Sequence, residues 1–222
     1  MKKVCIVHYN TSFMLSCLIK SINKHVENAY IYVFDNSDKD KFINTFDNVH
    51  VFDNTNGEII NFTEIIQKYH PEYTHKTDFT FGSFEHCISV QKAMELIDDN
   101  FVLIDSDVLI SKDFSCMYQS DKICVGTKQI WGDRICPVLC YINVKMCKEL
   151  NISYYNDYII GLQEMKDKKY DTGSYFTEQI KNMDIGHINI FNYILHYGGG
   201  SRALQHNMTL DDWAISHKRL WL

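Results

Sequence analysis

Two acidic residues separated by a serine, Asp105-Ser106-Asp107, directly follow the apolar run 101–104 (FVLI). Carboxylates placed one residue apart can hold a hard divalent cation through oxygen, and they leave coordination positions for the phosphates of a ligand. This pattern predicts a metal-assisted enzyme that acts on a phosphorylated substrate. The alternative is a solvated turn at the end of a strand, because aspartate and serine both favour turns.

The elements that must position this pair follow an alternating pattern of strands and helices. Short runs of β-branched and apolar residues predict buried strands at 3–8, 30–34, 49–52 and 101–104. Apolar residues at helical spacing predict helices at 12–26 and 83–97. Turn-forming residues follow the strands, as expected at the carboxyl edge of a parallel sheet, where open α/β folds bind ligands. We therefore predict an α/β fold of three layers (α/β/α), with a mostly parallel central sheet flanked by helices.

The second half of the chain is less regular. Strand-like segments occur at 123–127, 137–143 and 188–195, a helix is predicted at 174–181, and the stretch 151–169 is polar and rich in tyrosine. The chain has 222 residues, of which 45% are hydrophobic, and it contains no internal repeat or low-complexity linker. A length and composition of this kind suit one α/β domain, so we expect residues 1–222 to form a single domain.

Charge and cysteine content argue against several classes of protein. The formal net charge is −6 and no block is rich in Lys or Arg, which disfavours nucleic acid as a partner because such binding depends on neutralising phosphates. The eight cysteines include no C-x-x-C pair, and the amino terminus is a charged start followed by a strand instead of a signal peptide. We therefore expect buried free thiols and a cytoplasmic location. Zinc binding by Cys136, Cys140 and Cys147 is the alternative.

No transmembrane segment is expected. The longest apolar stretches have the length of a strand, far short of the ~20 residues that a membrane-spanning helix requires. Residues 217–222 (HKRLWL) mix basic and aromatic side chains, a composition that can contact lipid and would place the protein peripherally at the inner face of the membrane. A docked or frayed terminus is the alternative.

The turn after the first predicted strand lacks a phosphate-binding loop. Residues 8–12 read HYNTS and match neither GxGxxG nor GxxxxGK[ST], which disfavours the usual dinucleotide and P-loop sites. Without a cradle of backbone amides, another group must neutralise phosphate charge. A cation held by Asp105 and Asp107 would do so.

Taken in order along the chain, these features resemble a glycosyltransferase of the GT-A fold, similar to the bacterial family 2 enzymes that build surface polysaccharides. The resemblance runs from Val4 to about Arg202. Its parts are an opening strand, turn and helix; an acidic turn after the second strand; Asn56-Gly57 after the third; Ser83-x-x-His86 on the helix before the acidic pair; the DxD pair itself; and a late His-x-Gly-Gly-Gly-Ser at 196–201.

The resemblance implies two ligands. The first half of the chain, about residues 1–110, would bind a nucleotide-diphosphate sugar, with UDP- or GDP-sugars as the expected donors. The second half, about 111–222, would bind a saccharide or lipid-linked saccharide acceptor and contribute a metal-binding loop near the carboxyl terminus.

Several residues would contact the nucleotide in such an enzyme. Asp35 would accept a hydrogen bond from the nucleobase or shape its pocket, with Asn36 and Ser37 beside it. The alternative for Asp35 is a residue that caps a turn. Asn56 and Gly57 would let the backbone approach the nucleoside, with a plain turn as the alternative.

Ser83 and His86 lie one helical turn apart and share a face of the predicted helix. In the resembling enzymes that face points at the nucleotide, so His86 would hydrogen-bond the donor. The alternative is a partly buried histidine with a structural role.

The resemblance also implies the ligands of a metal. Asp105 and Asp107 would bridge Mn²⁺ or Mg²⁺ to the diphosphate, and one of them can instead bind the ribose. His196 would be the third ligand, and a mixed imidazole and carboxylate set favours Mn²⁺. Ser201 would contact the donor after three glycines that allow close approach to phosphate, and Arg202 would add a cationic clamp.

Asp171 is the predicted catalytic base, because Asp-Thr-Gly precedes a helix much as the base-bearing motif does in inverting family 2 enzymes. The chain lacks their commoner acidic doublet, and Asp171 would alternatively cap the helix. Glu178 and Asp133 are reserve candidates. We expect an inverting transferase, with retention as the open alternative.

Two other functions stay open at this point. A nucleotidyltransferase can share such a sheet and also needs a cation, although it is expected to have a glycine-rich and basic loop after the first strand. A catalytically inactive nucleotide-sugar-binding protein is the second rival, although the acidic pair and His196 are both intact.

Overall fold

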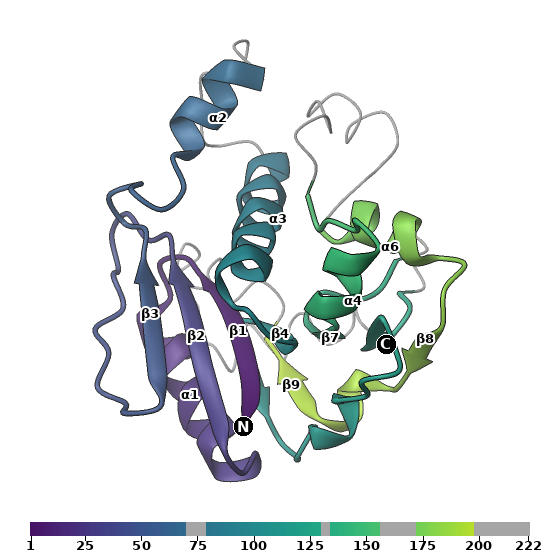
Figure 1. Ribbon diagram of the computed structural model, residues 1–222. Coiled ribbons are helices and arrows are strands. Elements are labelled where there is room, and N and C mark those ends of the chain that lie inside the picture. The colour runs from purple at the N-terminus through teal and green to yellow at the C-terminus, as the bar shows by residue number, and fades with distance from the viewer. Residues whose placement is uncertain (70–78, 130–133, 156–171, 198–222) are drawn as a thin grey trace.

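A seven-stranded sheet forms the centre of the computed structural model, which describes residues 1–69, 79–129, 134–155 and 172–197 (Figure 1). Its strands are β1 (Lys2–His8), β2 (Ala29–Asp35), β3 (Val49–Asp53), β4 (Phe101–Asp105), β6 (Cys124–Gly126), β7 (Leu139–Ile142) and β8 (Ile185–His187). The spatial order is β3-β2-β1-β4-β7-β6-β8. The first four of these pair in parallel, β7 runs antiparallel to both β4 and β6, and β6 is parallel to β8.

A second, two-stranded sheet lies beyond the end of β4. It pairs β5 (Val108–Ile110) with β9 (Ile194–His196) in antiparallel register, so that Val108 lies opposite His196. The 3₁₀ turns η1 (Ser115–Met117) and η2 (Ile190–Asn192) lie close in sequence to these strands. This small sheet joins the acidic motif to the last described segment of the chain.

Helices cover both faces of the central sheet (Figure 1). On one face α1 (Ser12–His25) packs against the side chains of Val4 and Ile6 from β1. On the other face lie α3 (Phe79–Leu96), α4 (Val144–Glu149) and α6 (Ser174–Ile180), whose buried residues share a core cluster with Cys5 and Val7 of β1. Successive side chains of a strand point to opposite faces, and a strand covered on both faces reads as one continuous apolar run.

The helix α1 forms because its apolar residues recur every three or four positions. The buried side chains are Met14, Leu15, Leu18, Ile19 and Ile22, whereas Phe13 is 70% exposed. Lys24 and His25 lie in the last turn, where positive charge favours the helix dipole. Thr11 occupies the N-cap, yet its side chain makes no capping hydrogen bond. A threonine cap usually contributes about 1 kcal/mol, and Thr11 does not make this contribution.

The structure confirms the predicted α/β architecture and corrects it in the second half. The predicted strand at 188–195 is wrong, because that segment passes from η2 into the three-residue strand β9. The helices α2 (Phe62–Tyr69) and α4 and the strand β5 were not predicted. Within the described part of the chain, no helix combines the length and apolar character needed to cross a membrane.

All eight cysteines are free thiols. Cys136, Cys140 and Cys147 are buried, and burial raises the pKa of the Cys136 and Cys147 thiols to about 11 and about 12. Among the described residues, no group of three His, Cys, Asp or Glu side chains is gathered so that it could hold a metal ion as it stands.

Candidate active site

The acidic motif lies at the carboxyl edge of the sheet. Asp105 is the last residue of β4, between β1 and β7, and its backbone amide donates to the carbonyl of Val138 at 3.1 Å. Asp107 lies in the turn that leads into β5. Their side chains are 26% and 16% exposed, so both carboxylates are largely enclosed and still reach the surface.

His196 lies beside this motif because β9 pairs with β5. The backbone amide of Tyr197 donates to the carbonyl of Asp107 at 2.9 Å, and His196 Nε2 is 3.4 Å from Asp107 Oδ1. Burial lowers the pKa of His196, but the hydrogen bond and charge of Asp107, together with the charge of Asp105, outweigh it and raise the pKa above its ordinary value. The structure thus brings together two residues far apart in the sequence.

His86 approaches the motif from α3. Its Nε2 lies 3.2 Å from Asp105 Oδ1. Both ring nitrogens of His86 are buried and neither has a hydrogen-bond partner of good geometry. Ser83 lies one turn earlier on the same helix. The site therefore contains two carboxylate and imidazole pairs, Asp105 with His86 and Asp107 with His196.

The chemistry of these side chains fits a cation, although they do not form a ready cluster. Carboxylate and imidazole are suitable ligands for Mn²⁺, and the buried His86 Nδ1 has no hydrogen-bond partner. Two ligands about 2.1 Å from one metal and at right angles to it lie about 3 Å apart, close to the spacing within each pair. The described residues nevertheless form two separate pairs instead of one group of three, so metal binding would require the pairs to converge.

Asp35, predicted to contact the nucleobase or to shape its pocket, binds its own loop in this structure. The residue is fully buried at the end of β2. Its Oδ1 accepts from the amide of Ser37 at 3.0 Å, and its Oδ2 accepts from the amide of Phe42 at 2.8 Å. Asp35 therefore holds the chain after β2 in place, which is the turn-capping alternative.

This structural role predicts that Asp35→Ala destabilises the fold. The substitution leaves two buried amides without an acceptor, and each unsatisfied buried donor costs at least about 1 kcal/mol, so we expect urea unfolding to show a loss of at least about 2 kcal/mol. Asp53→Ala is the control, because Asp53 forms an exposed pair with Lys41 and should change stability by less than about 1 kcal/mol. Unchanged stability with lost nucleotide affinity would restore the ligand role.

The neighbouring predicted nucleotide contacts are also engaged in the scaffold. Asn36 Nδ2 donates to Ser89 Oγ on α3 at 2.8 Å, and Asn36 Oδ1 accepts from Asn54 at 3.0 Å. The buried Ser37 accepts from the amide of Asn10 at 2.9 Å. Asn56 is exposed and accepts from the amide of Glu58, which is a plain turn.

Two asparagines that were not predicted as site residues hold these loops in place through hydrogen bonds to backbone amides. Asn10 adopts a positive φ of 51°, and its Oδ1 accepts from the backbone amides of Asp38, Lys39 and Asp40. The buried Asn54 accepts from the amides of Ile59 and Ile60. Asparagine tolerates a positive φ and accepts hydrogen bonds from neighbouring amides, so the sequence signal was an asparagine one or two residues after a strand.

Tyr9 presents an accessible ring at the same edge of the sheet. It follows β1, it is 45% exposed, and burial together with the charge and hydrogen bond of Asp38 raises its pKa to about 12. Tyr9 thus lies in the turn after β1, the position at which a dinucleotide-binding or P-loop protein has a glycine-rich loop.

The remaining predicted site residues divide into two groups. Glu178 is described, and it lies on the exposed side of α6 in an ion pair with Lys181, so it is a weak candidate for a base. The others lie outside the described residues: Asp171, Asp133, Ser201 and Arg202.

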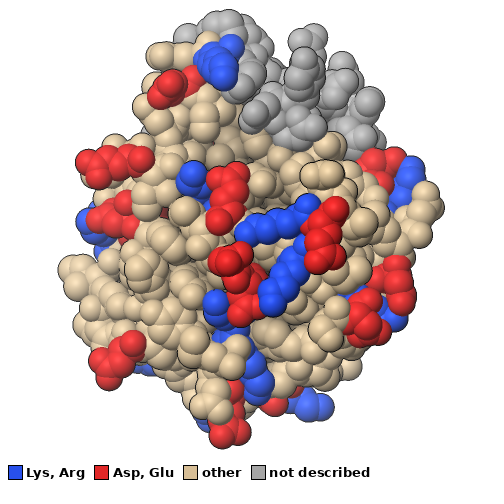
Figure 2. Space-filling model, viewed as in Figure 1, with Lys and Arg blue, Asp and Glu red and all other residues tan. Residues whose placement is uncertain are grey.

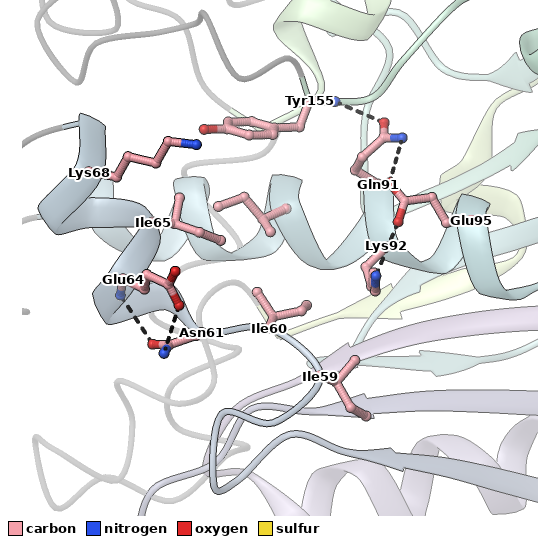
Figure 3. A pocket seen from close by; sticks show the side chains of 11 residues that line it. Ile59, Ile60, Asn61, Glu64, Ile65, Lys68, Gln91, Lys92, Glu95 and Tyr155 are labelled. Carbon is pink, nitrogen blue, oxygen red and sulfur yellow. Dashed lines mark hydrogen bonds and ion pairs between the residues drawn. The ribbon is translucent and has the colours of Figure 1, made fainter.

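A pocket of about 380 Å³ lies between α2 and α3 and does not include the acidic motif (Figure 3). Isoleucines including Ile60 and Ile65 line its apolar part. On its polar side Gln91 Oε1 accepts from the amide of Tyr155, and Lys92 pairs with Glu95. These groups already bind one another, and we assign the pocket no part in the chemistry.

The charged surface is mixed. On the face shown in Figure 2, basic side chains are interspersed with acidic ones and form no broad basic patch. Ion pairs of the described residues include Lys3 with Asp99 and Lys148 with Asp98. This face lacks the concentrated positive charge that nucleic-acid binding requires.

No protein-family model and no curated protein matches the chain, but solved structures do. The galactosyltransferase LgtC, in complex with donor and acceptor sugar analogs, matches with a TM-score of 0.53 and 10% identity over 85% of this chain and 73% of that chain. An active-site mutant of LgtC matches with a TM-score of 0.55 and 9% identity over the same shares. The bifunctional glycosyltransferase WbbM matches with a TM-score of 0.52 and 14% identity over 85% of this chain, which spans only 39% of WbbM. At such identities the likeness concerns the fold, and it shows that this chain has a GT-A-like α/β fold.

Proposed function

We propose that this protein is a metal-dependent glycosyltransferase that moves a sugar from a nucleotide-diphosphate sugar to a hydroxyl acceptor. The observation that carries the proposal is that Asp105 pairs with His86 and Asp107 pairs with His196 at the carboxyl edge of a GT-A-like sheet. The neighbour LgtC, solved with donor and acceptor sugar analogs, supports the same class of ligands.

Each described residue has a role in this proposal. Asp105 and Asp107 hold the cation with His196, and His86 contacts the donor or Asp105. Bound there, Mn²⁺ supplies the positive charge that stabilises a departing diphosphate. The ring of Tyr9 offers a face against which a nucleobase can stack, since burying an aromatic face is favourable.

The proposal extends to points that rest on the sequence. Asp171 is the proposed base that takes the proton from the acceptor hydroxyl, which would give inversion. UDP- or GDP-sugars are the proposed donors, Mn²⁺ the preferred ion, and a saccharide or lipid-linked saccharide the acceptor. A cytoplasmic role in bacterial surface polysaccharide synthesis, as in the family 2 enzymes, completes the proposal.

A thermal-shift panel tests the donor and the metal together. UDP-, GDP- and dTDP-sugars are compared with and without Mn²⁺, and CMP-sugars serve as controls because they carry only one phosphate. We expect one diphosphate donor at a hundred times its Kd to raise Tm by roughly 5–10 °C, and only with Mn²⁺. Release of nucleoside diphosphate in the presence of saccharide acceptors then measures turnover.

The outcomes separate the possible functions. Metal-dependent binding without turnover on any acceptor would favour an inactive binding protein. No metal-dependent stabilisation by any donor would contradict the proposal.

A further inference from the structure

The hydroxyl of Thr11 does not cap the helix that it precedes. Thr11 occupies the N-cap of α1, where threonine normally accepts from a backbone amide of the first turn, but it makes no such bond. Its Oγ1 instead lies 3.3 Å from His8 Nδ1 and 3.5 Å from Ser106 Oγ. Places where a local rule is broken are expected at functional sites.

His8 is the buried partner of this hydroxyl. It is the last residue of β1, its side chain is fully buried, and its Nε2 has no hydrogen-bond partner. Nε2 faces Asp35 Oδ1 at a distance of 3.9 Å. Burial lowers the pKa of His8 and so favours the neutral ring, although the charge of Asp35 and the backbone hydrogen bond and charge of Asp40 act in the opposite direction.

The direction of the hydrogen bonds follows from this environment. A neutral imidazole has one N–H and one bare nitrogen, and a bare Nε2 facing the carboxylate of Asp35 would be repelled. A proton on Nε2 avoids this repulsion, and Nδ1 is then free to accept from the hydroxyl of Thr11. Thr11 Oγ1 would in turn accept from the hydroxyl of Ser106. Hydrogen-bond contacts thus form a row from His8 through Thr11 to Ser106, and Asp35 lies next to its buried end.

Ser106 is the middle residue of the acidic motif, so this row reaches the proposed metal site. Ser106 contacts Thr11 at the start of α1, whereas Asp105 contacts His86 on α3. Because α1 and α3 cover opposite faces of the sheet, the motif is held from both sides.

We propose that Thr11 is a positioning residue that, together with the buried His8, fixes Ser106 and thereby the directions of Asp105 and Asp107. This inference rests on the proposed function, because its effect is on metal binding. It also explains the residue between the two aspartates: a serine supplies the hydroxyl that anchors the turn, and an alanine would not.

A double-mutant cycle tests the row. Thr11→Val removes the hydroxyl with little change of shape, Ser106→Ala removes its partner, and Thr11→Ser restores the hydroxyl. Ser16→Ala is the matched control, since the Ser16 hydroxyl bonds only within α1, to the carbonyl of Ser12 at 2.9 Å. Mn²⁺ affinity is measured by calorimetric titration, and circular dichroism checks that each variant is folded.

We expect Thr11→Val and Ser106→Ala each to weaken Mn²⁺ binding about three- to tenfold, the range of one net hydrogen bond. The double variant should be no weaker than either single variant, because both break the same row. Thr11→Ser and Ser16→Ala should bind like the wild type. Wild-type affinity in Thr11→Val, or effects that multiply in the double variant, would overturn the inference.

A second readout separates this inference from the proposed function. Imidazole ¹⁵N NMR of the wild type should show His8 neutral with its proton on Nε2, and the Nδ1 resonance should shift in Thr11→Val and in Ser106→Ala. If the wild type binds no Mn²⁺, the proposed metal site fails, and NMR alone decides whether the row exists. Unchanged His8 resonances in both variants would refute it.

Discussion

Replacing Asp107 with asparagine is expected to lower the rate of sugar transfer by about 10²–10³-fold, the usual cost of removing one electrostatic group that stabilises a transition state. Asparagine keeps the shape of the side chain but removes the negative charge that would hold a cation and that faces His196 at 3.4 Å. Steady-state release of nucleoside diphosphate measures the rate, and calorimetry should show weaker Mn²⁺ binding in parallel.

Asp121→Asn is the matched control for this substitution. Asp121 is 73% exposed and pairs only loosely with Lys122, at 3.5 Å, so its neutralisation should leave both turnover and Mn²⁺ affinity unchanged. A rate within twofold of the wild type in Asp107→Asn, at limiting Mn²⁺, would show that Asp107 takes no part in holding the metal.

Phe101→Ala is expected to produce the largest loss of stability. Phe101 opens β4, is fully buried and belongs to the core on the α3 face of the sheet. Deleting a buried phenyl ring removes its transfer free energy and leaves a cavity, which together cost about 3–5 kcal/mol. Urea unfolding followed by circular dichroism should show a lower midpoint at an unchanged slope.

Phe13→Ala provides the comparison, because Phe13 lies on the solvent side of α1 and is 70% exposed. The free energy of unfolding should change by no more than about 0.5 kcal/mol. Equal losses in the two variants would mean that the core assigned to the α3 face does not carry the stability of the sheet.

The parts of the fold that could be predicted from the sequence are those with strong periodic signals. Strands β1, β2 and β4 are covered on both faces, so their apolar runs are continuous and easy to recognise. Strand β5 has only three residues and directly follows a turn, which leaves no pattern to detect. The predicted strand at 188–195 failed because Asn189 accepts from the amide of Phe191 and starts a 3₁₀ turn.

The site was predictable in its composition but not in its contacts. The types and order of Asp105, Asp107 and His196 predicted that these residues belong to one site. The pairing of β5 with β9, which brings His196 beside Asp107, depends on residues far apart in the sequence and leaves no local pattern. The burial of Asp35 could not be predicted either, because an aspartate after a strand has the same sequence whether it faces a ligand or the backbone amides of its own loop.

The pairing of β5 with β9 also has a consequence for folding. Residues 108 and 196 are far apart in the sequence, and closing so long a loop is entropically unfavourable for strands of three residues. We therefore expect the contact between His196 and Asp107 to form late in folding. A cation bound by both segments would then act as a reversible cross-link between distant parts of the chain. Adding Mn²⁺ should therefore lower the unfolding rate by a larger factor than it raises the folding rate.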